Sequence, residues 1–430
     1  MKTLLISLAL FFSVAAFADI DGDPLYANTV GTNGASFYAW RPFYSSSTGP
    51  ERWRKDYLWP LYTKKGFKDE QYARFLFFGY SMKFSPETER ERHWLLPFYF
   101  QGISAEDEDY LAIFPLGGTI YEFLGRDKIT FVLFPIWYTS DINDVHSWTV
   151  LWPLISSTQG EKVDRFRVLP FYSRNTLAGE YEKKYYGWPL LSTVKYTHER
   201  NPGGGFIFIP IYGQIKTEKA DNYWLFPPFF RYMASEKQWI VYAPWPFIQL
   251  ADGEIKKRIF WPFYGKKELG TLRKQYMFWP IFWNRVTTYA EHERRSKKVV
   301  PFFHYQADVV TKAVKEYEVG EARSKYWKLW PLMSWERNAE HSRFRALELW
   351  PLRNTAGIER NWAPWWTLYR RVNEGGEIGH HVLWGIYRQK RSPEQFEWSL
   401  LKGLVGYKNI ENNRSYRFLF MWFGDEEKQP

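Results

Sequence analysis

The sequence predicts an all-β protein, a large antiparallel up-and-down β-meander of about 20 strands. A short apolar motif centred on proline recurs about every 18 residues along most of the chain. Aromatic residues make up 21% of the sequence, and aromatic and β-branched residues favour strands. Beyond the N-terminus, no apolar run approaches the roughly 20 residues that a membrane-spanning helix needs.

Residues 1–18 have the features of a secretory signal peptide. Lys2 supplies the positive start, Leu4–Phe12 form the apolar stretch, and Ala16-Phe17-Ala18 matches the small-x-small cleavage pattern. The apolar stretch is short for the alternative, a membrane anchor. We expect residues 19–430 to form a single β-repeat domain, because no change in composition marks a boundary. With no cysteine in the chain, disulfides and cysteine-based zinc sites are excluded.

The repeated motif consists of two or three apolar residues, often ending in Trp, followed by Pro, another apolar residue and often an aromatic one. It holds 17 of the 25 prolines, and between Pro97 and Pro301 successive copies lie 16 to 21 residues apart. We take the following residues as its structural markers: Trp59, Pro60, Pro97, Pro115, Pro135, Trp152, Pro153, Pro170, Trp188, Pro189, Pro210, Trp261, Pro262, Trp279, Pro280, Trp330, Pro331, Trp350 and Pro351.

Each repeat is expected to be one strand plus one polar turn. A helix is disfavoured because proline in every copy would cost about 3 kcal/mol or more each time. Consecutive strands joined by short turns are antiparallel neighbours. Both sides of segments such as Phe131–Tyr138 are apolar, and charge-free windows such as Ser147–Thr158 run to 12 residues. These windows match the ~9–11 residues of a tilted strand that crosses a bilayer.

The prolines favour closure of the sheet into a barrel. Proline cannot donate to a strand ladder and is confined to edges, strand starts or bulges. Since about 20 neighbouring strands cannot all be edges, we expect a bulge at the same level in every strand. Repeated bulges curve a sheet, and closure removes edges that would aggregate.

No catalytic, cofactor or metal site is predicted. His380 and His381 are adjacent and should lie on opposite faces of a strand, and Glu291-His292-Glu293 sits in a charged run typical of a solvated turn. A glycosidase needs only two carboxylates across a cleft, but no pair is indicated. The segment Ala307–Arg323 lengthens one repeat and is expected to be a longer loop, a short helix or a degenerate strand.

The first hypothesis for function is an exported, non-enzymatic protein that forms a barrel in the outer membrane of a diderm bacterium. Its role would be structural or transport, with an apolar or lipidic substrate, and its partner would be outer-membrane lipid. Two features oppose a porin: the inner face is apolar, and Trp clusters near mid-strand. The alternatives are a soluble periplasmic or surface binding module and an exported hydrolase. The net charge is +11, but Lys and Arg are interspersed with Glu and Asp, so no nucleic-acid partner is expected.

Overall fold

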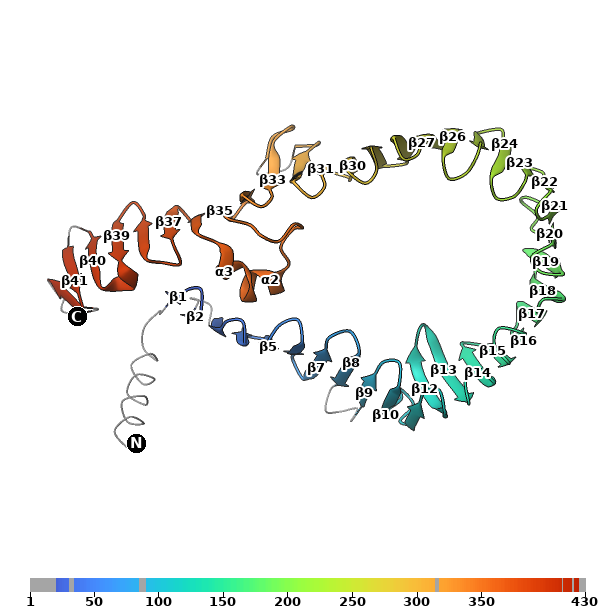
Figure 1. The fold of residues 1–430 in the computed structure, drawn as a ribbon, viewed down its shortest axis with the longest axis horizontal. Helices are drawn as coiled ribbons and strands as arrows, with labels where there is room; N and C mark the ends of the chain where they lie inside the picture. Colours follow the sequence, from blue (N-terminus) through green and yellow to red (C-terminus); the bar gives the residue numbers. More distant parts are fainter. Residues whose placement is uncertain are drawn as a thin grey trace. The chain divides into compact units, whose positions relative to one another are not determined.

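The computed structural model describes residues 21–30, 35–84, 90–313, 317–411, 413–419 and 421–424. The expected signal peptide, residues 1–18, lies outside these ranges. The described chain is all-β and forms an antiparallel up-and-down sheet of 42 strands (Figure 1). It divides into two compact units, a first unit of residues 1–76 with 288–430 and a second unit of residues 77–287. No helix in the described ranges is long and apolar enough to cross a lipid bilayer.

The second unit is a run of short strands, each paired with the next along the chain. Its strands are β8 (Gly79–Lys83), β9 (Glu91–Leu95), β10 (Tyr99–Ile103), β11 (Asp109–Ile113), β12 (Gly117–Phe123), β13 (Arg126–Val132), β14 (Trp137–Ile142), β15 (Val145–Val150), β16 (Ile155–Gln159), β17 (Val163–Val168), β18 (Tyr172–Leu177), β19 (Tyr181–Tyr186), β20 (Leu191–Tyr196), β21 (Gly203–Phe208), β22 (Tyr212–Thr217), β23 (Ala220–Leu225), β24 (Phe230–Ser235), β25 (Gln238–Tyr242), β26 (Ile248–Gly253), β27 (Ile255–Phe260), β28 (Tyr264–Leu269), β29 (Leu272–Met277) and β30 (Phe282–Thr288).

The first unit has the same hairpins and one helical insertion. Its strands are β1 (Asp21–Gly22), β2 (Tyr26–Val30), β3 (Ser36–Trp40), β4 (Tyr44–Thr48), β5 (Arg52–Tyr57), β6 (Tyr62–Phe67), β7 (Glu70–Phe75), β31 (His292–Val299), β32 (Phe303–Val310), β33 (Ala322–Leu329), β34 (Met333–Arg337), β35 (His341–Ala346), β36 (Tyr369–Glu374), β37 (Glu377–Val382), β38 (Tyr387–Arg391), β39 (Gln395–Leu400), β40 (Val405–Ile410), β41 (Asn413–Phe418) and β42 (Met421–Gly424). The helices are α2 (Ala356–Asn361), α3 (Ala363–Trp366) and the 3₁₀ turn η2 (Leu401–Gly403).

The proline motif is a hairpin turn, not a bulge in a strand, so the prediction of about 20 strands is wrong. In the copy at Leu151–Leu154 the N–H of Leu154 donates to the carbonyl of Leu151 at 2.8 Å, which closes a four-residue turn between β15 and β16. The charge-free window Ser147–Thr158 therefore folds back on itself as the end of one strand, a turn and the start of the next. One repeat is a whole hairpin, with an apolar turn at one end and a polar turn at the other.

Hydrogen bonds between neighbouring turns explain why proline is suited to this place. The N–H of Trp152 donates to the carbonyl of Pro135 at 2.8 Å, and the N–H of Trp188 donates to Pro170 at 2.6 Å. Proline has no N–H to leave without a partner, and its carbonyl accepts a hydrogen bond from the next turn. Leu151, which starts its turn, has φ of 48°, and Gly187 takes the same place in its own copy with φ of 52°, where glycine has no steric penalty.

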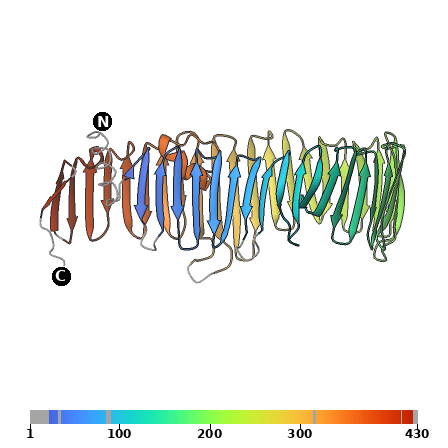
Figure 2. The same ribbon diagram turned by 90° about the horizontal axis from the view of Figure 1, so that it is seen from below.

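In each unit the two kinds of turn lie at opposite ends of the strands, along the two long sides of the sheet, which we call its turn edges. Apolar turns always follow an odd-numbered strand, for example β9–β10 and β17–β18, whereas polar turns follow an even-numbered strand. Because neighbouring strands are antiparallel, all turns of one kind fall on one edge, and Figure 2 shows the turns along the two edges.

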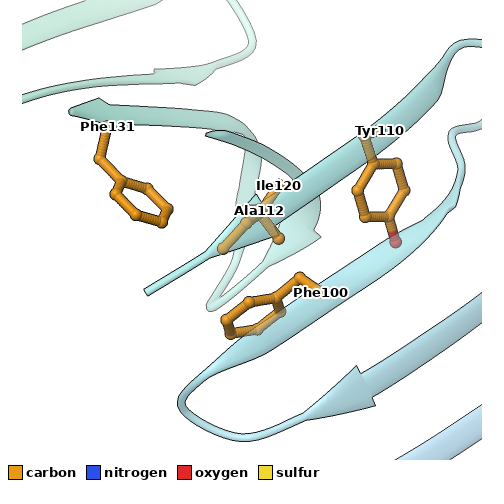
Figure 3. Packing of buried hydrophobic residues seen from close by; sticks show 5 residues of the cluster. All are labelled: Phe100, Tyr110, Ala112, Ile120 and Phe131. Atoms are coloured by element: carbon orange, nitrogen blue, oxygen red, sulfur yellow. The ribbon is translucent and has the colours of Figure 1, made fainter. Parts of the chain in front are cut away.

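Buried apolar side chains in the second unit form a local cluster on the sheet. The cluster in the second unit consists of Phe100, Tyr110, Ala112, Ile120 and Phe131, which come from the four consecutive strands β10–β13 (Figure 3). Phe100 pairs with Ala112 in the strand register, so an aromatic ring lies beside a small side chain on the same face. Stability in this unit therefore rests on cross-strand pairs and backbone hydrogen bonds more than on a thick core.

The expected closure into a barrel is not made by strand hydrogen bonds in the described residues. β1 pairs with β2, and β42 pairs with β41. The first unit instead joins its early and late strands through α2 and α3, which occupy the long connection between β35 and β36 (Figure 1).

That insertion was not predicted, because Trp350 and Pro351 looked like another regular copy of the motif. The expected excursion at Ala307–Arg323 is only partly a loop. Its beginning and end belong to β32 and β33, which extend to eight residues each, and residues 314–316 lie outside the described ranges.

Candidate functional site: an apolar turn edge and a buried charged cluster

The apolar turns form an exposed edge, which we call the apolar turn edge. The residue after most motif prolines is an exposed hydrophobic side chain; Phe171, for example, is 72% exposed. In the second unit these residues are Phe98, Leu116, Ile136, Leu154, Phe171, Leu190, Ile211, Phe247, Phe263 and Ile281. In the first unit the equivalent positions are Phe43, Leu61, Phe302 and Leu332.

The tryptophans and prolines predicted to mark the motif lie in these turns, with one exception. Trp152, Trp188 and Trp279 are each about half exposed, as is expected of turn tips rather than of a core layer. Trp350 and Pro351 instead lead into α2. Isolated exposed hydrophobic residues are ordinary, but an apolar row of this regularity is typical of an interaction surface.

Residues behind the apolar turn edge follow a fixed order along the strands. A tyrosine opens many of the strands that leave an apolar turn, and Lys, Arg, Gln or Ser follow it. Examples are Tyr62 in β6, Tyr172 in β18, Tyr212 in β22 and Tyr264 in β28. In these strands the order is therefore an apolar turn, a tyrosine and then charged side chains.

A buried charged cluster lies in the first unit, where α2 and α3 meet β33–β36. Lys328, Ser334, Arg345 and Arg370 are successive partners in the strand register and so form one row on one face. Lys328 donates to a carboxylate oxygen of Glu348 at 3.1 Å, and both side chains are almost wholly buried, at 2% and 1% exposed.

Both members of that pair have further partners. Lys328 also donates to the carbonyl of Leu352 at 2.9 Å, and Glu348 accepts from Ser334 at 2.8 Å and from Arg345 at 3.2 Å. Burial lowers the pKa of Lys328, while the charge of Glu348 acts in the opposite direction. The network thus satisfies charges that would be very costly to bury alone.

Arg345 links the strand row to the helical insertion. It donates to Glu359 of α2, with one contact of 2.8 Å, and Arg343 lies 3.6 Å from the same carboxylate. Burial acts to lower the pKa of Arg345, but the carboxylates of Glu359 and Glu348 outweigh it and raise the pKa. Arg343 likewise holds the pKa of Glu336 below its ordinary value, although burial acts to raise it.

The early strands of the first unit carry a row of mostly small, buried side chains on one face of the sheet, near α2. Ala27, Ala39, Ser45, Asp56 and Thr63 are successive partners in register across β2–β6, and all five are buried. A flat row of short side chains lets a helix approach the sheet closely.

Several contacts hold α2 and the residue after it on this part of the sheet. Arg360 donates to Asp56 at 3.0 Å, and the indole N–H of Trp362 donates to the carbonyl of Trp59 at 2.9 Å. Gly357 packs on the Trp59 ring, where an added Cβ would come within 2.4 Å of it. The insertion therefore bridges strands that are about 300 residues apart in the chain.

The chemistry available in this cluster is ionic. Its carboxylates are each engaged by arginine or lysine, so the cluster is held together by ion pairs. Within the described ranges, no group of three or more His, Cys, Asp or Glu side chains is placed to hold a metal ion. His380 contacts the Tyr369 hydroxyl at 2.9 Å while His381 lies beside Arg370, so the two histidines occupy opposite faces of β37.

The sequence reasoning missed this cluster, although a signal was present. Lys328 and Glu348 occupy the same place in successive copies of the motif, two residues before Trp330 and Trp350. In the other copies with Trp before Pro this position is apolar, so a lysine and a glutamate there, one repeat apart, indicate a paired buried site.

Comparison of the sequence with models of known protein families and with curated proteins found no match.

Proposed function

We propose that this protein is a non-enzymatic component of the bacterial outer membrane, with a structural or transport role, that contacts lipid through the apolar turn edge. The observation that carries the proposal is the exposed hydrophobic residue after most motif prolines. Transfer of such side chains from water into an apolar phase is favourable by about 1.5–3 kcal/mol each. A regular row of them gives a large combined affinity for a hydrocarbon surface.

The order of residues behind the edge favours lipid over a folded protein partner. Apolar tips, then tyrosines, then lysines and arginines follow the order of hydrocarbon, interface and headgroup in a membrane. β6 is an example, since Tyr62 is followed by Thr63, Lys64 and Lys65. The net charge of +11 also suits an anionic lipid surface.

The short strands favour insertion of the edge over a full crossing of the bilayer. A six-residue strand such as β17 is about 20 Å long at ~3.3 Å per residue, whereas the hydrocarbon core is about 30 Å thick. We therefore propose that the apolar turn edge enters the outer part of one leaflet, and that an apolar or lipidic substrate is handled along this edge.

Flotation with vesicles of phosphatidylethanolamine and phosphatidylglycerol tests this proposal. The test variant carries Phe171→Glu and Ile211→Glu on the apolar turn edge. The matched control carries Leu124→Glu and Ala178→Glu on the opposite edge, where Leu124 is 81% exposed. Loss of two apolar contacts, at about 1.5–3 kcal/mol each, should lower the partition coefficient on the order of 100-fold or more in the test variant alone.

Equal loss of vesicle binding in both variants, or no flotation of the wild-type protein, would overturn the proposal. A parallel measurement in the native host asks whether the protein stays in outer membranes after a carbonate wash. Retention of the wild type and release of the test variant are the expected results.

A further inference from the structure

Four consecutive strands of the second unit, β27–β30, carry a row of positive charges on one face (Figure 1). Lys257 pairs with Lys267 in the strand register, and Lys267 pairs with Lys274. Lys274 in turn pairs with Arg285, so the four side chains lie next to one another, and we call them the cation row. Like charges placed directly opposite one another destabilise a sheet. The cation row is therefore a cost to the fold unless an anion binds to it.

No acid of the described residues forms an ion pair with the cation row. Lys257 has a neutral partner, the hydroxyl of Tyr242 at 3.4 Å. The other face of the same strands differs, because Lys256, Glu268 and Arg273 are successive partners in one register row and their signs alternate. Only one face of these strands thus has four like charges in succession.

An aromatic layer lies between the cation row and the apolar turn edge. Tyr276 and Trp283 lie two residues nearer to the apolar turn than the cations of their own strands, on the same face. Their ring centroids are 5.4 Å apart. The Tyr276 ring also lies against Gly265, where an added Cβ would come within 2.1 Å of it. One face therefore presents exposed apolar tips, then aromatic rings, then unpaired cations.

The spacing along the strand places the cation row at the depth of lipid headgroups. Lys267 follows Phe263 of the apolar turn edge by four residues, which is about 13 Å at ~3.3 Å per residue. Interfacial segments bury their apolar side about 5–10 Å deep, which would leave the cations about 3–8 Å outside the hydrocarbon. The headgroup region of one leaflet is about 5–8 Å thick.

We propose that the cation row binds the phosphate groups of anionic lipids whose acyl chains contact the apolar turn edge. This inference rests on the proposed function, because it requires the turns of the same strands to enter the leaflet. At ~4.8 Å between neighbouring strands the row extends over about 14 Å, so it reaches more than one phosphate group. Each lysine or arginine close to an anionic leaflet strengthens binding about fivefold.

The test is flotation of the full chain with two kinds of vesicle, phosphatidylcholine alone and equal parts of phosphatidylcholine and phosphatidylglycerol. The test variant carries Lys257→Gln and Lys274→Gln. The matched control carries Lys256→Gln and Arg273→Gln, which remove the same charge from the same two strands, one residue away and on the opposite face.

We expect the partition coefficient for the anionic vesicles to fall roughly 25-fold in the test variant and to stay within about threefold of wild type in the control. Binding to phosphatidylcholine vesicles should be the same in all three proteins. The test variant should unfold at no lower temperature than wild type, because the change removes like charges that face each other. Salt gives a readout that needs no variant: high ionic strength should abolish the preference of the wild type for anionic vesicles.

The failure of this inference differs from the failure of the proposed function. Equal binding of wild type to the two kinds of vesicle, or equal losses in the two variants, would overturn the headgroup site and leave the apolar turn edge as a lipid contact. No flotation of wild type with either kind of vesicle would contradict the proposed function, and the headgroup site with it.

Discussion

Replacement of Glu348 by Gln tests the claim that the buried charged cluster holds the helical insertion on the sheet. One oxygen of Glu348 accepts from Lys328 and Asn354, and the other accepts from Ser334 and Arg345. The amide of glutamine replaces one of these acceptors with a donor, so in either orientation an N–H₂ group faces a donor. The substitution keeps the shape of the side chain and removes the charge.

The expected cost follows from the burial of the pair. Lys328 and Glu348 are 2% and 1% exposed, so water cannot replace the lost partner. Breaking a buried ion pair from one side costs about 3–5 kcal/mol, and the clash of donors places Glu348→Gln toward the upper end of that range. Removal of both charges should cost much less than the sum of the single changes, because neither charge is then left alone.

The assay is a double-mutant cycle of urea unfolding, with Glu348→Gln, Lys328→Met and the double variant. The coupling energy should be at least ~2 kcal/mol, with the double variant more stable than additivity predicts. Lys325→Met on the same strand is the control; Lys325 is exposed, so its loss should change the free energy of unfolding by no more than about 0.5 kcal/mol. Additive single effects, or a cost below ~1 kcal/mol for Glu348→Gln, would refute the reasoning.

Two further predictions concern the same unit. Burial, together with nearby positive charges led by Lys298, lowers the pKa of His304 from 6.5 to about 4. Between these pH values the unfolded chain binds more protons than the folded chain. The free energy of unfolding should therefore fall by up to ~3 kcal/mol as the pH drops from 6.5 to 4. Urea unfolding across this range should show the slope in wild type and a flatter line in His304→Gln; parallel curves would contradict the assignment. Gly357→Ala should lower the free energy of unfolding by about 1–3 kcal/mol, because the added Cβ meets the Trp59 ring. The control Gly379→Ala, whose Cβ has open space nearby, should cost less. Equal shifts of the melting temperature would show that the helix can move away from Trp59.

The repeat, the all-β class and the antiparallel meander followed from the sequence, but the content of one repeat did not. The period of about 18 residues was assigned to a single strand, which made proline a mid-strand bulge. Strands are usually five or six residues long, so 18 residues hold two strands and two turns. The turn was hard to recognise because its residues, such as Leu151 to Leu154, are among the most apolar in the chain, whereas turn prediction relies on Gly, Asn and Asp.

The candidate site was less predictable than the fold for a physical reason. Its charges are brought together by contacts between distant parts of the chain, such as Asp56 with Arg360, and no local pattern reports such contacts. The helical insertion also contains apolar residues and a second proline, Pro364 of α3, that resemble the repeat on either side. Only the charges placed two residues before Trp330 and Trp350 distinguished this part of the sequence.

The helical insertion and the buried charges depend on each other. An ordinary hairpin turn would leave the face of β33–β36 uncovered, and Lys328 and Arg345 could then be solvated. Once α2 and α3 cover that face, both side chains are buried and require partners, which the insertion and the residues leading into it supply as Glu348 and Glu359. The same insertion carries Arg360 to Asp56 of β5, so its ion pairs also connect α2 to the early strands of this unit.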